Sequence, residues 1–278
     1  LFQGIEAVLN EGGANRAVGD RLLWWGIEVA QKRPLWLEVV AAGRPGHASG
    51  FHPVTAPHLL ISALARVVAL PHRWHVTPPA RDYLAALAPL QNEQLRPIYR
   101  DITPHITPAG PRAGVALMPG MQNLFLDTLQ VTVLAAGSQT NVIPAEARAR
   151  IDIRLLPDTD EEAFLATVRD ALGPQIETSV LLRAPPSAPS PTSSPVYREI
   201  AAFLGKEGPV VPAFGVGLTD SHFFRERGIP AYGVSPFAIS GDELRISRPI
   251  ATIFGLKNFT TACPNLYATP LLIWPGKV

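Results

Sequence analysis

The segment Ala147–Leu155 constrains the fold most, because alanine and isoleucine alternate in it with arginine and aspartate. Such alternation is typical of a strand that buries one face and exposes the other. Further elements are expected around it: strands at Leu22–Ala30, Leu35–Ala42, Asn123–Ala136 and Gln175–Arg183, and helices at Ala56–Leu70 and Asp158–Leu172. The order strand, strand, helix, strand, strand, helix, strand predicts a compact α+β sandwich with helices on one sheet face. We expect the first two strands to be adjacent and antiparallel.

The proline- and serine-rich segment Pro185–Pro195 is a predicted linker at a domain boundary. Elements of a second α/β unit are expected on both sides of the sandwich: a strand at Ile5–Leu9, then, after the linker, a helix at Pro195–Leu204, a strand at Val210–Phe214, a helix capped by Thr219-Asp220 and running to Arg227, and a strand at Ile229–Val234. We therefore predict an inserted domain at about residues 34–184, flanked by two pieces of another domain. Inside it, the proline-rich segment His72–Gly120 is interpreted as a surface insertion with one helix at Ala80–Leu90.

Composition excludes several classes of protein. The chain has 278 residues, of which 47% are hydrophobic, so it can bury a sizeable core. Its 24 basic and 23 acidic residues give a formal charge of +1 without a basic block, which argues against a nucleic acid or an anionic membrane as partner. Its apolar stretches are too short for a membrane span. Because Cys263 is the single cysteine, any metal would need histidine and carboxylate ligands.

Two short segments after predicted strands carry polar groups suited to chemistry. Glu11 lies in Asn10-Glu11-Gly12-Gly13, where a carboxylate at the end of a strand can bind zinc; it can also be a solvated turn residue. His47 lies in Gly43-Arg44-Pro45-Gly46-His47-Ala48-Ser49, a tight loop from which it can donate a hydrogen bond to developing negative charge. The alternative for His47 is a loop histidine at a strand end.

Two further segments lie later in the chain. Asn141 stands in a turn, Asn141-Val142-Ile143-Pro144, and Arg154 lies on the polar face of its strand, from which it can grip a carboxylate with two hydrogen bonds. Both can equally be surface residues. Thr219 and Asp220 open a helix, with Asp220 as a plain N-cap, and His222 in the first turn can be a surface residue. The serine-hydrolase elbow, the His-Glu-x-x-His zinc motif and the phosphate-binding loop are all absent from the sequence.

Together, in this order and spacing, these segments resemble the aminoacylase/carboxypeptidase family of co-catalytic zinc metallopeptidases, over about residues 4 to 246. The resemblance implies an α/β fold: residues 1–33 and 185–246 belong to a catalytic domain, and residues 34–184 form an inserted α+β, ferredoxin-like lid that dimerises. It also implies hydrolysis of an amide or peptide bond in an N-acyl amino acid or peptide, by a water bridging two zinc ions.

The resemblance also assigns roles to single residues. Glu11 matches a zinc ligand, and His47 matches a lid histidine that reaches the partner's active site to hold the oxyanion. Asn141 and Arg154 match lid positions that contact the substrate, and Thr219 and Asp220 match a pair that supports the wall of the site.

The sequence departs from the family pattern at both ends. The family's other upstream zinc ligands precede the position of Glu11, and nothing lies upstream here. Residues 247–278 are an atypical tail: the expected final histidine is replaced from Ser247, which suggests a frame error with recovery near Leu256, where a helix can start. We therefore expect an incomplete copy that retains zinc poorly and is inactive alone. The alternative is a non-catalytic dimerisation or peptide-binding module.

Overall fold

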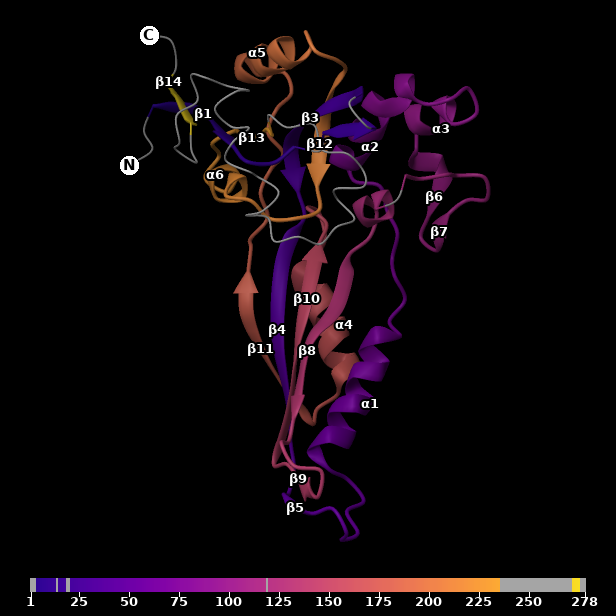
Figure 1. The fold of residues 1–278 in the computed structure, drawn as a ribbon, viewed down its shortest axis with the longest axis vertical. Helices are drawn as coiled ribbons and strands as arrows, with labels where there is room; N and C mark the ends of the chain where they lie inside the picture. The colour runs from indigo at the N-terminus through magenta and orange to yellow at the C-terminus, as the bar shows by residue number, and fades with distance from the viewer. Residues whose placement is uncertain (1–3, 14, 19–20, 119, 236–271, 276–278) are drawn as a thin grey trace.

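The structure is a computed structural model that describes residues 4–13, 15–18, 21–118, 120–235 and 272–275. Two β-sheets follow one another along the long axis of the molecule (Figure 1). The predicted change of character at Ser247 and the predicted helix start at Leu256 both lie outside the described residues. No helix in the described ranges is long and apolar enough to cross a membrane.

The first sheet contains the strands from both ends of the chain. Its order is β12 (Val210–Gly215), β3 (Arg21–Gln31), β13 (Ala231–Gly233), β1 (Ile5–Asn10) and β14 (Leu272–Pro275), with β2 (Arg16–Val18) paired to β3. β1 runs parallel to β13 and β12 runs parallel to β3, whereas β13 and β3 are antiparallel. Helix α5 (Pro195–Leu204) packs Val196, Tyr197 and Leu204 onto this sheet. The short helix α6 (Ser221–Arg225) precedes β13.

The second sheet is the predicted α+β sandwich. Its order is β11 (Ile176–Arg183), β4 (Arg33–Ala42), β10 (Glu146–Leu155) and β8 (Thr128–Ala136), with every neighbouring pair antiparallel. Helices α1 (Ala56–Val68) and α4 (Glu161–Leu172) cover one face (Figure 1). The chain order β4, α1, β8, β10, α4, β11 is that of a ferredoxin-like fold, which confirms the predicted fold class.

The alternation in β10 decides which face of this sheet meets the helices. Ala149, Ile151 and Ile153 are at most 1% exposed and pack with α1 and α4, whereas Arg148 and Arg150 project from the opposite face. Burying apolar surface contributes about 25 cal/mol per Å² to stability. A shift of β10 by one residue would turn this apolar stripe away from the helices, so burial of the stripe fixes the register of β10.

The expected antiparallel pairing of Leu22–Ala30 with Leu35–Ala42 is wrong. The two segments are β3 and β4, which belong to different sheets and are separated only by Lys32. A hairpin needs a reversal, usually with Gly, Asn or Asp at its centre, and the chain has none of these between the two strands. The chain therefore runs on from one sheet into the other.

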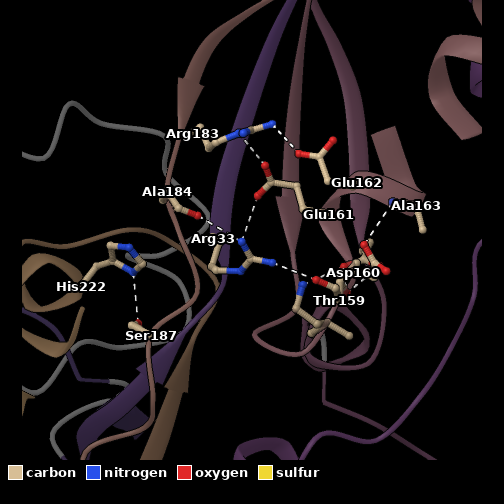
Figure 2. Close-up of polar contacts among 12 residues, drawn as sticks. Arg33, Thr159, Asp160, Glu161, Glu162, Ala163, Arg183, Ala184, Ser187 and His222 are labelled. Atoms are coloured by element: carbon tan, nitrogen blue, oxygen red, sulfur yellow. Dashed lines mark hydrogen bonds and ion pairs between the residues drawn. The ribbon is translucent and has the colours of Figure 1, made fainter. Parts of the chain in front are cut away.

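Buried basic side chains hold this crossing in place. Lys32 is 1% exposed, and its Nζ donates to the carbonyl oxygen of Leu126 at 2.9 Å and to Thr128 Oγ1 at 3.2 Å. Arg33, also 1% exposed, pairs with Glu161 at 3.0 Å and donates to the carbonyl oxygens of Thr159 and Ala184 (Figure 2). Because buried charge without partners is costly, these contacts fix the junction of the two sheets.

The segment read as a surface insertion instead supplies part of a core. Helix α2 (Pro78–Leu87) lies against β12, and α3 (Arg96–Arg100) follows it. Tyr83, Leu84 and Tyr99 are at most 5% exposed and pack with Trp24, Ala213 and Phe214 of the first sheet. Proline content predicted irregularity correctly: the remaining elements are short, namely η1 (Ala88–Leu90), η2 (Thr103–His105), β6 (Ile106–Thr107), β7 (Gly110–Pro111) and η3 (Met121–Leu124). It did not reveal the apolar face of α2.

Candidate functional site

The turn after β1 carries the predicted metal ligand. Glu11 comes directly after Asn10, the last residue of β1, and its side chain is exposed. Gly12 and Gly13 have φ values of +136° and +89°, a region that residues with a side chain rarely adopt. A Cβ on Gly13 would overlap the carbonyl oxygen of Gly26 in β3. The two glycines therefore bring the Glu11 turn close against β3.

A buried ion pair lies beneath this turn. Glu28 of β3 and Arg225 of α6 are 5% and 4% exposed, with Oε1 and Nη1 3.5 Å apart. Arg225 also donates to the carbonyl oxygens of Glu28 at 3.0 Å and Ala231 at 2.7 Å, and to Ser190 Oγ at 3.0 Å. Burial raises the pKa of Glu28 to about 7; the charge of Arg225 opposes the rise and that of Glu11 adds to it. The sequence signal for this pair was a lone acidic residue in an apolar strand.

The turn before α6 is fastened to the end of β3. Thr219 Oγ1 donates to Gln31 Oε1 at 3.0 Å, and the Thr219 carbonyl oxygen accepts from Gln31 Nε2 at 3.2 Å. Asp220 stands at the predicted N-cap position, but its side chain makes no capping hydrogen bond and its backbone is helical, with φ −60° and ψ −17°. A capping side chain needs an extended backbone to reach the first amides. The helix also ends at Arg225, two residues before the predicted Arg227.

His222 is buried, so its interpretation as a surface residue is wrong. It is 0% exposed, and its Nδ1 lies 3.3 Å from the hydroxyl of Ser187 in the proline-rich linker (Figure 2). Its Nε2 is buried without a hydrogen-bond partner among the described residues. Burial lowers the pKa of His222, which keeps the ring neutral and suits it to packing between α6 and the linker.

His47 and Asn141 meet at the far end of the second sheet. The short strand β5 (Gly46–His47) pairs with β9 (Val142–Ile143), and the amide of Ala48 donates to the carbonyl oxygen of Asn141 at 2.9 Å. We call this end, residues 43–55 and 139–143, the tip. His47, Asn141 and most residues around them are exposed, so the tip presents polar groups outward.

The hydrogen bonds of His47 decide which of its ring nitrogens carries the proton. The amide of Ser49 donates to His47 Nδ1 at 3.2 Å, and Ser49 Oγ lies 2.8 Å from the same nitrogen. A neutral imidazole has one donor and one acceptor nitrogen, and an amide can only donate. Nδ1 is therefore the acceptor, and Nε2–H is a hydrogen-bond donor on an exposed side chain.

Arg154 lies on the sheet face opposite α1 and α4, near the junction of the two sheets. Its Nε and Nη2 donate to the two carboxylate oxygens of Asp152 at 2.6 and 2.8 Å, and its guanidinium stands 5.9 Å from the ring centre of Trp36. The side chain of Arg154 is 26% exposed. The guanidinium is therefore oriented by the Trp36 ring and by Asp152. A substrate carboxylate could replace Asp152 as its hydrogen-bond acceptor.

The structure brings some of the predicted residues together and separates others. Glu11 and Thr219 both interact with Glu28, at the carboxyl end of β1. His47 and Asn141 lie at the opposite end of the molecule (Figure 1). The ten residues of β4 separate the junction from the tip by about 33 Å at 3.3 Å per residue. Within one copy, His47 therefore cannot contact a ligand held at Glu11.

Comparison with known proteins decides the family. The model of the M20 peptidase dimerisation domain matches residues 29–178, which contain β4, β8 and β10 of the second sheet, the start of β11, and helices α1 and α4. This chain belongs to the M20 peptidase family. The match includes the tip and the packed segment α2–α3, and it confirms the aminoacylase/carboxypeptidase resemblance.

Several relatives are aminoacylases. The chain is 26% identical to mouse aminoacylase-1 over 250 residues, which cover 84% of this chain and 49% of the mouse protein. It is 24% identical to human aminoacylase-1 over 279 residues, covering 95% and 57%. The chain thus spans about half the length of the curated relatives it matches. A solved structure, human carnosine dipeptidase 1, superposes on 76% of this chain and 50% of its own with a TM-score of 0.49 and 13% identity.

M20 enzymes use zinc, and the described residues do not fit a zinc centre on their own. Zinc needs three or four convergent side chains from Cys, His, Asp or Glu. No group of three such side chains that could hold a metal lies in the described ranges. Glu11 fits at most as a single ligand, because the acidic side chain beside it, Glu28, is buried against Arg225.

Proposed function

We propose that this chain is part of an amide-bond hydrolase for N-acyl amino acids or peptides. The observation that carries the proposal is the pair of oriented donors in the dimerisation domain: Nε2–H of His47 at the tip and the guanidinium of Arg154 near the junction. The first suits a carbonyl oxygen that gains negative charge, and the second suits the free carboxylate of an amino acid. Family membership and the aminoacylase relatives support the same substrate class.

The proposal assigns the remaining residues as follows. Glu11 is a zinc ligand, Asn141 contacts substrate beside His47, and Thr219 and Asp220 support the wall of the site. Residues 1–33 and 185–246 belong to the catalytic domain, residues 34–184 are the inserted lid, and residues 247–278 are a tail. Within the lid, the segment 74–126 packs back onto the catalytic sheet.

A homodimer through the lid is part of the same proposal. β8 is an edge strand of the second sheet, and α1 lies beside it (Figure 1). Together they expose large apolar side chains, with Leu134 at 66%, Ile61 at 64% and Val68 at 65%. Open strand edges with apolar side chains favour pairing with another chain. Because the tip is about 33 Å from the junction, His47 serves the site of the partner copy.

Substrate binding tests the role of Arg154. We expect N-acetyl amino acids to bind more tightly than the matching N-acetyl amino acid amides, because only the former can displace Asp152 with a carboxylate. Arg154→Met is expected to abolish this preference, while Arg148→Met, which changes an exposed arginine on the same face, keeps it. Calorimetric titration measures both. Equal affinity of the wild-type chain for acids and amides contradicts the substrate assignment.

Turnover and assembly are tested separately. Because no group of three metal-binding side chains lies in the described ranges, we expect this chain alone to bind N-acetyl amino acids without releasing amine on addition of zinc. Amine release would support hydrolysis by the chain itself and contradict the expectation that it is inactive alone. Leu134→Glu is expected to give monomers in sedimentation equilibrium, whereas Phe203→Glu, which changes an exposed residue of α5 outside the lid, leaves a dimer. A monomeric wild-type chain at high concentration contradicts the dimer.

A further inference from the structure

The loop of the tip is organised around the carbonyl group of His47. The amide of Gly50 donates to this carbonyl oxygen at 3.0 Å, and His52 Nε2 lies 3.1 Å from it. A carbonyl oxygen only accepts hydrogen bonds, so the proton of His52 is on Nε2 and points at His47. Two donors therefore fix the backbone of His47 from the far side of the loop.

The ring of His52 occupies space that two glycines leave open. A Cβ on Gly46 would lie 2.6 Å from His52 Cε1, and a Cβ on Gly50 would lie 3.0 Å from His52 Nε2. Neither glycine has a positive φ in this structure, so backbone conformation does not require glycine at these positions. The close approach of the His52 ring is what requires glycine at both positions.

These contacts leave one side of His47 constrained and the other open. Its carbonyl oxygen is held by Gly50 and His52, and its Nδ1 accepts from the amide of Ser49. Phe51, which lies between Gly50 and His52 in the sequence, is 93% exposed. Ser49, Gly50 and His52 therefore hold the loop together, whereas the side chain of Phe51 faces solvent.

We propose that His52 and Ser49 are positioning residues that hold His47 as an Nε2–H donor directed out of the tip. The ligand group that such a donor recognises is a carbonyl or oxyanion oxygen, and a general-base role for His47 is excluded because its acceptor nitrogen is already occupied. The consequence for catalysis rests on the proposed hydrolase function. The positioning itself is a property of the loop and is tested without substrate.

The test is NMR spectroscopy of the full ¹⁵N-labelled chain at pH 8. Long-range ¹H–¹⁵N correlation is expected to show His47, assigned by its loss in His47→Gln, as the Nε2–H tautomer, and the Ser49 amide is expected to exchange slowly with solvent. His52→Phe keeps a ring between the glycines but removes the donor. We expect it to accelerate exchange at Ser49 and Gly50 at least tenfold and to move the His47 ring nitrogens towards the shifts of exposed histidines such as His72.

Two further variants separate the hydrogen bond from general loop disruption. His52→Gln restores an N–H donor and is expected to recover slow exchange at Ser49. Phe51→Ala changes the adjacent exposed side chain and is expected to leave the His47 signals unchanged. An Nδ1–H tautomer for His47 in the wild-type chain, or His47 signals that do not respond to His52→Phe, overturns the proposal. Absence of hydrolysis leaves these signals unaffected and bears only on the proposed function.

Discussion

Replacing Glu28 by glutamine is expected to change how the stability of this chain depends on pH. Glu28 is 5% exposed, and burial raises its pKa from the ordinary 4.5 to about 7 despite the opposing charge of Arg225. The folded state therefore keeps a proton that the unfolded state releases between pH 4.5 and 7. The stabilisation linked to this proton is complete below pH 4.5 and is lost as the pH rises through 7.

The size of the effect follows from the two pKa values. They differ by about 2.5, and each pKa unit corresponds to about 1.4 kcal/mol, so the linked free energy over the full titration is about 3 to 4 kcal/mol. Glutamine carries no titrating proton. The free energy of unfolding of the wild-type chain is thus expected to fall relative to that of Glu28→Gln by up to about 3 kcal/mol between pH 5 and pH 8.

Urea unfolding followed by tryptophan fluorescence at several pH values measures this difference, because Trp24 and Trp25 lie on the same strand as Glu28. His222 titrates in both proteins and cancels in the comparison. A constant difference between the two proteins from pH 5 to pH 8 would refute the reasoning, since it would mean that Glu28 has the same pKa in the folded and unfolded chains.

Three further predictions concern the junction and the glycine turn. Gly13→Ala is expected to lower the free energy of unfolding by at least about 2 kcal/mol, because a Cβ there overlaps backbone. Gly217 has open space around it, so Gly217→Ala is expected to change this free energy by less than about 0.5 kcal/mol. Urea unfolding measures both, and equal losses of stability in the two variants would contradict the prediction. Arg33→Met is expected to cost about 2–3 kcal/mol, because two carbonyl oxygens lose their donor while Glu161 stays paired with a second arginine; a neutral result by the same assay argues against a tightly held junction. Burial lowers the pKa of Lys32 to about 8, so the unfolded state binds the extra proton and stability rises between pH 8 and pH 10.5; Lys32→Met is expected to remove that rise, measured as the melting temperature across this range.

The fold of the dimerisation domain could be predicted because its signals are local. The alternation in Ala147–Leu155 fixed a half-buried strand, and the helix at Ala56–Leu70 appears as α1 at Ala56–Val68. Each pattern depends only on which neighbours along the chain share a face. The predicted pairing of β3 with β4 was wrong because sheet membership is not a local property. Composition identifies a strand but does not say which sheet the strand joins.

The residues of the candidate site likewise fall into those that local sequence signals identify and those that only packing brings together. Sequence spacing singled out Glu11, His47, Asn141 and Arg154, because glycine turns and strand ends are visible in one dimension. It missed the buried pair of Glu28 and Arg225, 197 residues apart, whose contact exists only once β3 and α6 are packed.

What the sequence alone determined is therefore the family, the α+β fold of the dimerisation domain and a short set of candidate polar residues at strand ends. Tertiary structure decided that the chain runs straight from one sheet to the next, that α2 builds the core of the first sheet, and that the tip stands far from Glu11. The physical reason is that periodicity and turn chemistry act over a few residues, whereas sheet membership and the burial of charge depend on which distant surfaces exclude water together.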